Sequence, residues 1–170
     1  TTVYESETGK VVAGIRGTAR LSSQNVDRVR VTFRNTDTAS SANLAKYISG
    51  VSLWQGSTKL ATLAVTDASR ATADDTYTFN FSGLKAPVAK DAIGRFYVSV
   101  NANGSLDSTD ALTASWTVSF VSAGISASSP DGSYDTYPTT AITQTGLAFK
   151  KFSSSGLKAE VNLAATNPAS

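Results

Sequence analysis

The feature that most constrains the fold is a two-residue alternation of apolar and polar side chains that runs through most of the chain. The clearest example is DRVRVTFRN, in which Val29, Val31 and Phe33 share one face and the intervening polar residues share the other. No segment shows a sustained helical period. Further strand-like runs are Val11–Leu21, Ile48–Trp54, Thr58–Val65, Thr76–Phe81, Arg95–Val100, Leu112–Val121, Ala141–Phe152 and Leu157–Leu163. Many short strands bounded by turn-forming residues predict an all-β antiparallel sandwich.

The distribution of these runs predicts how the chain is organised. Residues 21–122 are expected to form the core of the sandwich, and residues 1–20 a strand-like extension able to act as a donor strand. Residues 123–140 contain two prolines and several turn formers, which predicts a loop or linker. Residues 141–170 are expected to supply strands that complete the sandwich or contact a neighbour.

The composition argues against several classes of function. Charged residues make up 16% of the 170 residues and the net charge is +2, against about 25% charged in an ordinary soluble domain. Such a neutral surface, rich in Ser, Thr, Ala and Gly, is typical of secreted and cell-surface β-proteins. The scattered basic residues do not predict nucleic-acid binding. No apolar run approaches the roughly 20 residues of a membrane-spanning helix.

The sequence offers little for catalysis. It has no cysteine and no histidine, so a thiol nucleophile, a thiolate metal site and the commonest general base are all missing. It has no Gly-x-Ser-x-Gly motif, and its paired aspartates lie in turn-like contexts. We therefore predict a protein without enzymatic activity or an organic cofactor. A hydrolase that uses a Ser–Lys or Asp-pair site is the least supported interpretation.

Two segments contain oxygen ligands at the density that Ca²⁺ prefers. One has Asn101, Asn103, Asp107 and Asp110, and the other has Asp131 and Asp135. Neither segment matches the EF-hand pattern, which requires a glutamate at its end. Asx turns explain the same residues without a metal, and turn statistics favour that interpretation.

Aromatic and arginine side chains each allow two interpretations. The aromatics in alternating strands are expected in the core rather than on a sugar-binding platform, and they are Trp54, Phe79, Phe81, Tyr97, Trp116 and Phe120. Tyr134 and Tyr137 lie in the predicted loop and are better candidates for contact with a partner. The row Arg28, Arg30, Thr32 and Arg34 is either a solvated outer face or a docking face for an acidic partner, and solvated faces are the commoner case.

The segment ISGVSLWQGSTKLATLAV resembles a hairpin of immunoglobulin-like β-sandwich modules in bacterial surface-layer and large cell-surface proteins. The likeness extends from Leu21 to Val121 and includes a later W-x-V-x-F strand. Between these lie spaced apolar and glycine positions, namely Phe81, Leu84, Val88, Gly94, Val98 and Val100. The chain departs from the family pattern at Gln55, where an acidic turn residue is usual, and at Lys90-Asp91. The resemblance implies a structural module without catalytic residues.

Together these features predict an extracellular, cell-surface structural subunit or module that assembles into a surface layer, fibre or pilus-like filament by β-strand pairing. The partners would be identical subunits or neighbouring domains. The assembly contacts are expected from alternating apolar residues near the N-terminus, namely Val3, Val11, Val12 and Ile15. The alternative is an adhesin whose sandwich binds a carbohydrate or a host receptor.

Overall fold

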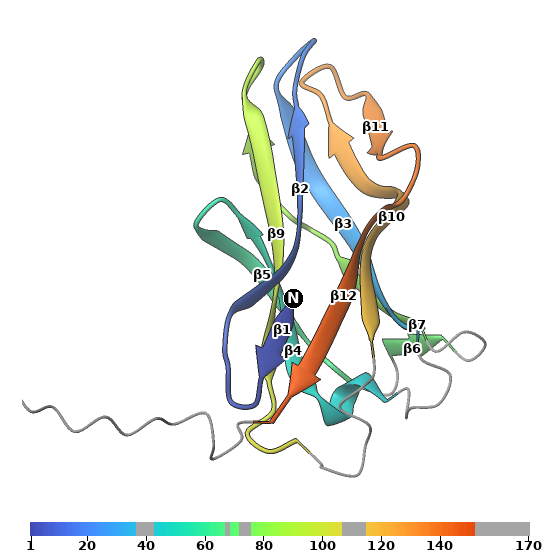
Figure 1. The fold of residues 1–170 in the computed structure, drawn as a ribbon. Helices are drawn as coiled ribbons and strands as arrows, with labels where there is room; N and C mark the ends of the chain where they lie inside the picture. The colour runs from blue at the N-terminus through green and yellow to red at the C-terminus, as the bar shows by residue number, and fades with distance from the viewer. Residues whose placement is uncertain (37–42, 67–68, 72–75, 107–114, 152–170) are drawn as a thin grey trace, which may run out of the picture.

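The computed structural model describes residues 1–36, 43–66, 69–71, 76–106 and 115–151. These residues form two β-sheets packed face to face, which confirms the predicted all-β sandwich (Figure 1). The predicted strand Leu157–Leu163 and the calcium candidates Asp107 and Asp110 lie outside the described residues.

Within the described residues the larger sheet has eight strands. They are β1 (Thr2–Tyr4), β3 (Gln24–Asn35), β6 (Arg70–Ala71), β7 (Thr76–Phe81), β8 (Ala86–Val88), β10 (Trp116–Ser128), β11 (Tyr134–Tyr137) and β12 (Ile142–Lys150). The order across the sheet is β1-β12-β10-β3-β7-β6, with β11 also beside β10 and β8 also beside β3. Neighbouring strands are antiparallel except for β1 and β12, which run parallel.

The smaller sheet, taken over the same residues, has the order β2-β9-β4-β5. Its strands are β2 (Lys10–Thr18), β4 (Ile48–Gln55), β5 (Thr58–Ala64) and β9 (Ile93–Ala102), all paired antiparallel. A short 3₁₀ helix, η1 (Leu44–Lys46), precedes β4, and Asn43 caps it by accepting a hydrogen bond from the Ala45 backbone. No helix in the described part of the chain is long and apolar enough to cross a membrane.

The connectivity differs from that of an immunoglobulin domain. In that fold strands A, B, E and D form one sheet and strands C, F and G form the other, so the chain crosses between the sheets three times. Here the consecutive strands β9 and β10 lie in different sheets, and β10 pairs with β3. Over the described strands the chain also crosses between β1 and β2, β2 and β3, β3 and β4, β5 and β6, and β8 and β9, which makes six crossings. The chain therefore changes sheets more often than an immunoglobulin domain does.

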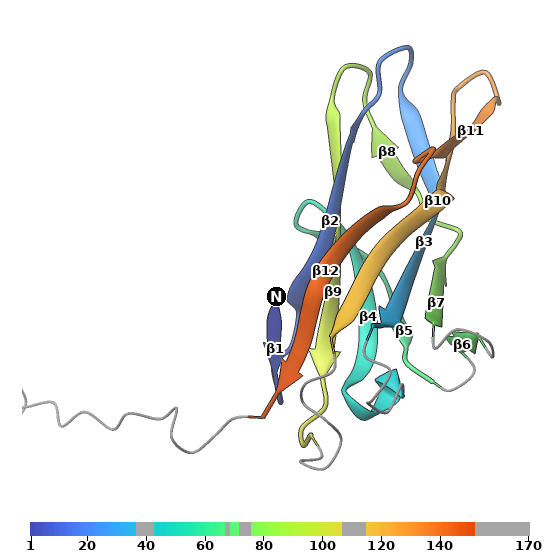
Figure 2. The same cartoon turned by 45° about the vertical axis from the view of Figure 1, so that its right-hand side comes forward.

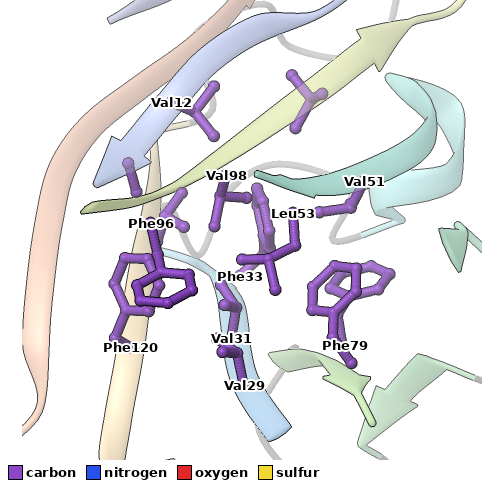
Figure 3. Close-up of a cluster of buried hydrophobic side chains, with 14 of the residues drawn as sticks. Val12, Val29, Val31, Phe33, Val51, Leu53, Phe79, Phe96, Val98 and Phe120 are labelled. Carbon is purple, nitrogen blue, oxygen red and sulfur yellow. The ribbon is translucent and has the colours of Figure 1, made fainter. Parts of the chain in front are cut away.

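The core lies between the sheets and is built from the alternating residues that the sequence indicates. Val29, Val31 and Phe33 are buried, as predicted, and face residues of the smaller sheet such as Leu53 and Val98 (Figure 3). At one end an aromatic cluster surrounds Trp116, whose ring lies 6.1 Å from Tyr47, 6.2 Å from Tyr77 and 6.4 Å from Phe149 between centroids.

The segment VSLWQGSTKLATLAV forms the β4–β5 hairpin. Gln55 pairs with Thr58 across a two-residue turn, and Gly56 adopts a φ of 57°, which a residue without a Cβ reaches at little cost. Val51 and Leu53 are buried, while Leu60 and Leu63 pack against the core from the edge strand. The hairpin is therefore a scaffold element.

Two segments differ from the expectation. Residues 1–20, expected as an extension, contain β1 and β2 and are part of both sheets. Residues 123–128, expected to open a long loop, continue β10 to Ser128, and β11 returns beside it as a hairpin. The pairing of β10 with β3 has a bulge between Phe120 and Ile125, where Ala123 adopts a φ of 52°. Beyond this bulge β10 pairs with β3 again, so the strand continues through its Ser/Ala/Gly-rich segment.

Candidate functional site at the open edge of strands β11 and β12

One edge of the larger sheet is only partly covered. β11 and β12 pair with the same side of β10 in succession, β11 along Ile125–Ser128 and β12 along Trp116–Phe120. On their outer side β1 pairs only with Ala148–Lys150 (Figure 2). In the part of the chain that the structure describes, no strand pairs with the outer edge of β11 or of residues 142–145.

Two apolar side chains on this edge point toward the core side of the sheet but remain exposed. Ile142 pairs with the buried Phe120, and Tyr137 pairs with the buried Ile125. Paired residues lie on the same face of a sheet. Ile142 is nevertheless 45% exposed and Tyr137 47% exposed. Over the described residues, the sandwich is therefore incomplete here in its side chains as well as in its backbone pairing.

The β12 part of this edge lacks the charged residues and the proline that help to prevent strand addition, although its pairing with β10 has a register shift between Gln144 and Leu147. β2, the edge of the smaller sheet, has a bulge and carries Lys10 and Arg16. β5, the other edge of that sheet, has a bulge in its pairing and carries Lys59. β12 has no charged residue and no proline before Lys150, although β11 contributes Asp135. Residues 142–145 are consequently the least protected exposed edge among these strands.

β1 shows how this edge accepts a strand. The Thr1 amino group donates to the Gly146 carbonyl oxygen at 2.8 Å, and the Ala148 amide donates to the Thr1 carbonyl oxygen at 3.0 Å. The Val3 side chain enters the core and is 0% exposed. Backbone hydrogen bonds and alternate buried side chains are the two contributions expected of strand addition.

The structure places the four predicted assembly residues within the chain's own fold. Val3 and Val12 are buried, and Ile15 is partly buried against the same core. Only Val11 is free to meet a neighbour, at 50% exposure on the outer face of β2. The expectation that these side chains fill a groove on a neighbouring subunit therefore needs correction. They fill a groove on this chain because β1 and β2 complete its two sheets.

The connection between β1 and β2 is held by local hydrogen bonds. The Ser6 amide donates to the Asn103 carbonyl oxygen and the Ala102 amide to the Glu7 carbonyl oxygen, both at 2.8 Å. The Glu7 carboxylate accepts a hydrogen bond from Lys10 Nζ at 2.8 Å and another from the Tyr4 amide. These two hydrogen bonds lower the pKa of Glu7. The N-terminal segment is thus tied to its own sandwich.

Four of the calcium candidates lie in the described residues, and they occupy two separate places. Asn101 Oδ1 accepts from the Gly9 amide at 2.9 Å, and Asn103 Nδ2 donates to the Ala45 carbonyl oxygen at 2.9 Å. Asp131 accepts from the amide and the hydroxyl of Ser133, an Asx turn that lowers its pKa. This hairpin and the segment after β9 lie at opposite ends of the sandwich (Figure 1). Among the described residues no three acidic side chains are grouped to hold a metal.

The two tyrosines predicted to contact a partner are the first and last residues of β11. Tyr134 is 66% exposed and Tyr137 lies on the open edge. Partial burial raises the pKa of Tyr137, and the neighbouring Asp135 carboxylate raises it further. The Tyr137 phenol therefore stays neutral at physiological pH. It can cover, or be covered by, apolar side chains of an incoming strand.

The predicted core aromatics divide into two groups. Phe79, Phe81, Trp116 and Phe120 are buried, as expected. Trp54 and Tyr97 alternate with the buried residues of β4 and β9, so they lie partly exposed on the outer face of the smaller sheet. The assignment of these two to the core is wrong. Alternation alone could have separated them, because Leu53, Phe96 and Val98 occupy the inward positions.

The arginine row of β3 lies opposite Val29, Val31 and Phe33, as the alternation predicts. Arg30 and Arg34 are exposed on the outer face of the larger sheet. A shallow hollow of about 410 Å³ on this face is lined by Arg34 and by hydroxyl residues that include Thr32 and Ser119. Nothing in this hollow distinguishes a docking face for an acidic partner from a solvated one.

Comparison with known proteins adds no family assignment. No protein-family model matches the chain, and no curated protein matches it significantly.

Proposed function

We propose that this chain is a non-catalytic structural subunit or module of a cell-surface assembly, in which a strand from a neighbouring copy or domain adds to the open edge of β11 and β12. The observation that carries the proposal is Ile142, which is 45% exposed on the core side of an uncharged stretch, residues 142–145, whose outer edge no described strand pairs with. A strand added beside it would pair the free backbone groups and cover the apolar side chain. A surface layer, a fibre and a pilus-like filament all fit this mode of association.

The C-terminal segment, which the sequence predicts to complete the sandwich or to contact a neighbour, is the donor in this proposal. Residues 157–163 read LKAEVNL, with apolar side chains at alternate positions and only two charged residues. The predicted N-terminal donor, by contrast, completes its own chain's sheets. We therefore assign the donor strand to the C-terminal segment of one copy and the acceptor edge to the next.

Two further features support a location on the cell surface. The charged fraction of 16% leaves a neutral, hydroxyl-rich chain, which is typical of secreted β-proteins. The hairpin and the strands around it resemble surface-layer modules, although the connectivity differs from an immunoglobulin domain.

The substitution Ile142→Lys should abolish assembly and leave the monomer folded. A lysine on an exposed edge opposes strand addition because the incoming strand would bury its charge. The side chain is already half exposed, so the free energy of unfolding should change by less than about 1 kcal/mol. Sedimentation velocity and electron microscopy of concentrated protein measure the assembly, and urea unfolding measures the stability.

The matched control is Ile93→Lys. Ile93 is 48% exposed at the start of β9, in the other sheet and away from the edge. The Ile93→Lys variant should assemble like the unsubstituted protein. Equal assembly of the Ile142→Lys variant, or equal loss in both variants, would contradict the proposal.

A further inference from the structure

The outer face of the smaller sheet carries a continuous cross-strand row of side chains. Gly14 of β2 pairs with Tyr97 of β9, Tyr97 pairs with Trp54 of β4, and Trp54 pairs with Lys59 of β5. All four positions lie on the face opposite the core, because their chain neighbours Phe96, Val98 and Leu53 are buried. Two aromatic rings on adjacent strands thus lie on one side of the sheet.

Both rings lean across the sheet toward β2. Trp54 Nε1 donates to Ser99 Oγ at 2.8 Å, which draws the indole from β4 over β9. Ser99 and its cross-strand neighbour Ser52 are buried although they belong to the outer face, as expected if the indole covers them. A Cβ on Gly14 would lie 2.9 Å from Tyr97 Cδ1, so the Tyr97 ring rests on the bare backbone of β2.

Cations surround the two rings. Lys59 Nζ lies over the Trp54 ring, 5.1 Å from its centroid. Arg16 and Arg95 are cross-strand partners next to Gly14 and Tyr97, and both are exposed. β2, β4, β5 and β9 contain no acidic residue. In the described residues neither arginine side chain has an ion-pair partner. The face is therefore positively charged.

We propose that this face binds an acidic polysaccharide, with Tyr97 and Trp54 stacking on sugar rings. The flexible Lys59 side chain moves from the Trp54 ring to a sugar carboxylate, and Arg16 and Arg95 contact further carboxylates. Adjacent strands are about 4.8 Å apart, about the length of one pyranose residue, so the two rings are placed for successive sugars. Thr62 of β5 is exposed on the same face and suits a sugar hydroxyl group. The positive charge selects an acidic glycan over a neutral one.

This inference is independent of strand addition, since the face and the open edge belong to different sheets. A surface subunit with both features would join its neighbours through one sheet and hold an anionic glycan matrix on the other. Loss of glycan binding would leave assembly intact, and loss of assembly would leave glycan binding intact.

Affinity electrophoresis and calorimetry with polygalacturonate, and with dextran as a neutral glycan, test the proposal. We expect binding to polygalacturonate that weakens as salt rises, and none to dextran. Trp54→Ala and Tyr97→Ala should each weaken binding at least about fivefold. Gly14→Val should also weaken it, because the new side chain displaces the Tyr97 ring without removing any contact group. Thermal melts identify any variant that loses its fold, and Trp54→Phe, which keeps a ring, should retain most of the affinity.

Two control variants show whether binding depends on this face or on any exposed cation or aromatic ring. Tyr134→Ala removes a more exposed aromatic of the other sheet, and Lys85→Gln removes an exposed cation elsewhere. Both control variants should bind polygalacturonate as tightly as the unsubstituted protein, whereas Arg95→Gln should bind it more weakly. No binding to polygalacturonate, or binding unchanged in Trp54→Ala and Tyr97→Ala, would overturn the proposal. Equally tight binding of oligo(dT) of similar charge would also overturn it, because the face would then be a surface for any polyanion.

Discussion

Replacing Val3 by aspartate should unfold the monomer or lower its free energy of unfolding by at least about 3 kcal/mol. Val3 is 0% exposed in β1, which pairs with β12 at the edge of the larger sheet, so the new carboxylate would be buried without a partner. Typical domains are stable by only about 5–15 kcal/mol. The loss would be visible as a large decrease in the urea midpoint.

Val11→Asp is the matched control for this substitution. Val11 is the same residue type in the same N-terminal region, but it is 50% exposed on the outer face of β2. Its substitution should change the free energy of unfolding by less than about 1 kcal/mol. If Val3→Asp were as stable as Val11→Asp, β1 would not belong to its own chain's core. An exchanged N-terminal donor strand would then be the better account.

Trp116→Ala should destabilise the monomer by about 3–5 kcal/mol. Trp116 is fully buried and is the centre of the aromatic cluster with Tyr47, Tyr77 and Phe149. Its removal would leave a large cavity between the sheets. Urea or thermal unfolding followed by tyrosine fluorescence or circular dichroism measures the change.

Trp116→Phe tests whether the destabilisation by Trp116→Ala comes from lost side-chain volume or from a lost hydrogen bond. Trp116 Nε1 is buried and has no hydrogen-bond partner among the described residues. Phenylalanine therefore loses part of the volume but no hydrogen bond, and we expect less than about 2 kcal/mol of destabilisation. A loss as large as that of Trp116→Ala would show that the cavity argument is wrong.

The sandwich itself was predictable because alternation reports burial directly. Val29, Val31 and Phe33 are buried as a set since each inward position of a two-layer sandwich faces the opposite sheet. The same rule could have placed Trp54 and Tyr97 outside. Their hydrophobicity favoured the core, but the phase of alternation in β4 and β9 takes precedence, because a strand cannot turn one residue over without a bulge.

Connectivity and edges could not be predicted in the same way. Whether β1 and β2 belong to this chain or to a neighbour depends on pairing between residues far apart in sequence, such as Val3 with Phe149 and Gly14 with Tyr97. The local alternation of apolar and polar residues is the same whether a strand pairs within its own chain or with a neighbour. The exposed Ile142 is equally invisible in sequence, because its exposure arises from the short length of β1 beside a longer β12.

The most direct test of the central claim is a cysteine cross-link between the proposed donor and acceptor. The chain has no cysteine, so each introduced pair reports one contact, and a disulfide requires Cα atoms within about 7 Å. A Gln144→Cys variant is mixed with variants that carry cysteine at Ala159, Val161 or Leu163, and the concentrated mixture is oxidised. The account predicts a disulfide-linked dimer of the two variants for at least one tail position. The absence of a mixed dimer at every tail position would contradict it. So would a variant with both cysteines in one chain, if its disulfide formed only within that chain.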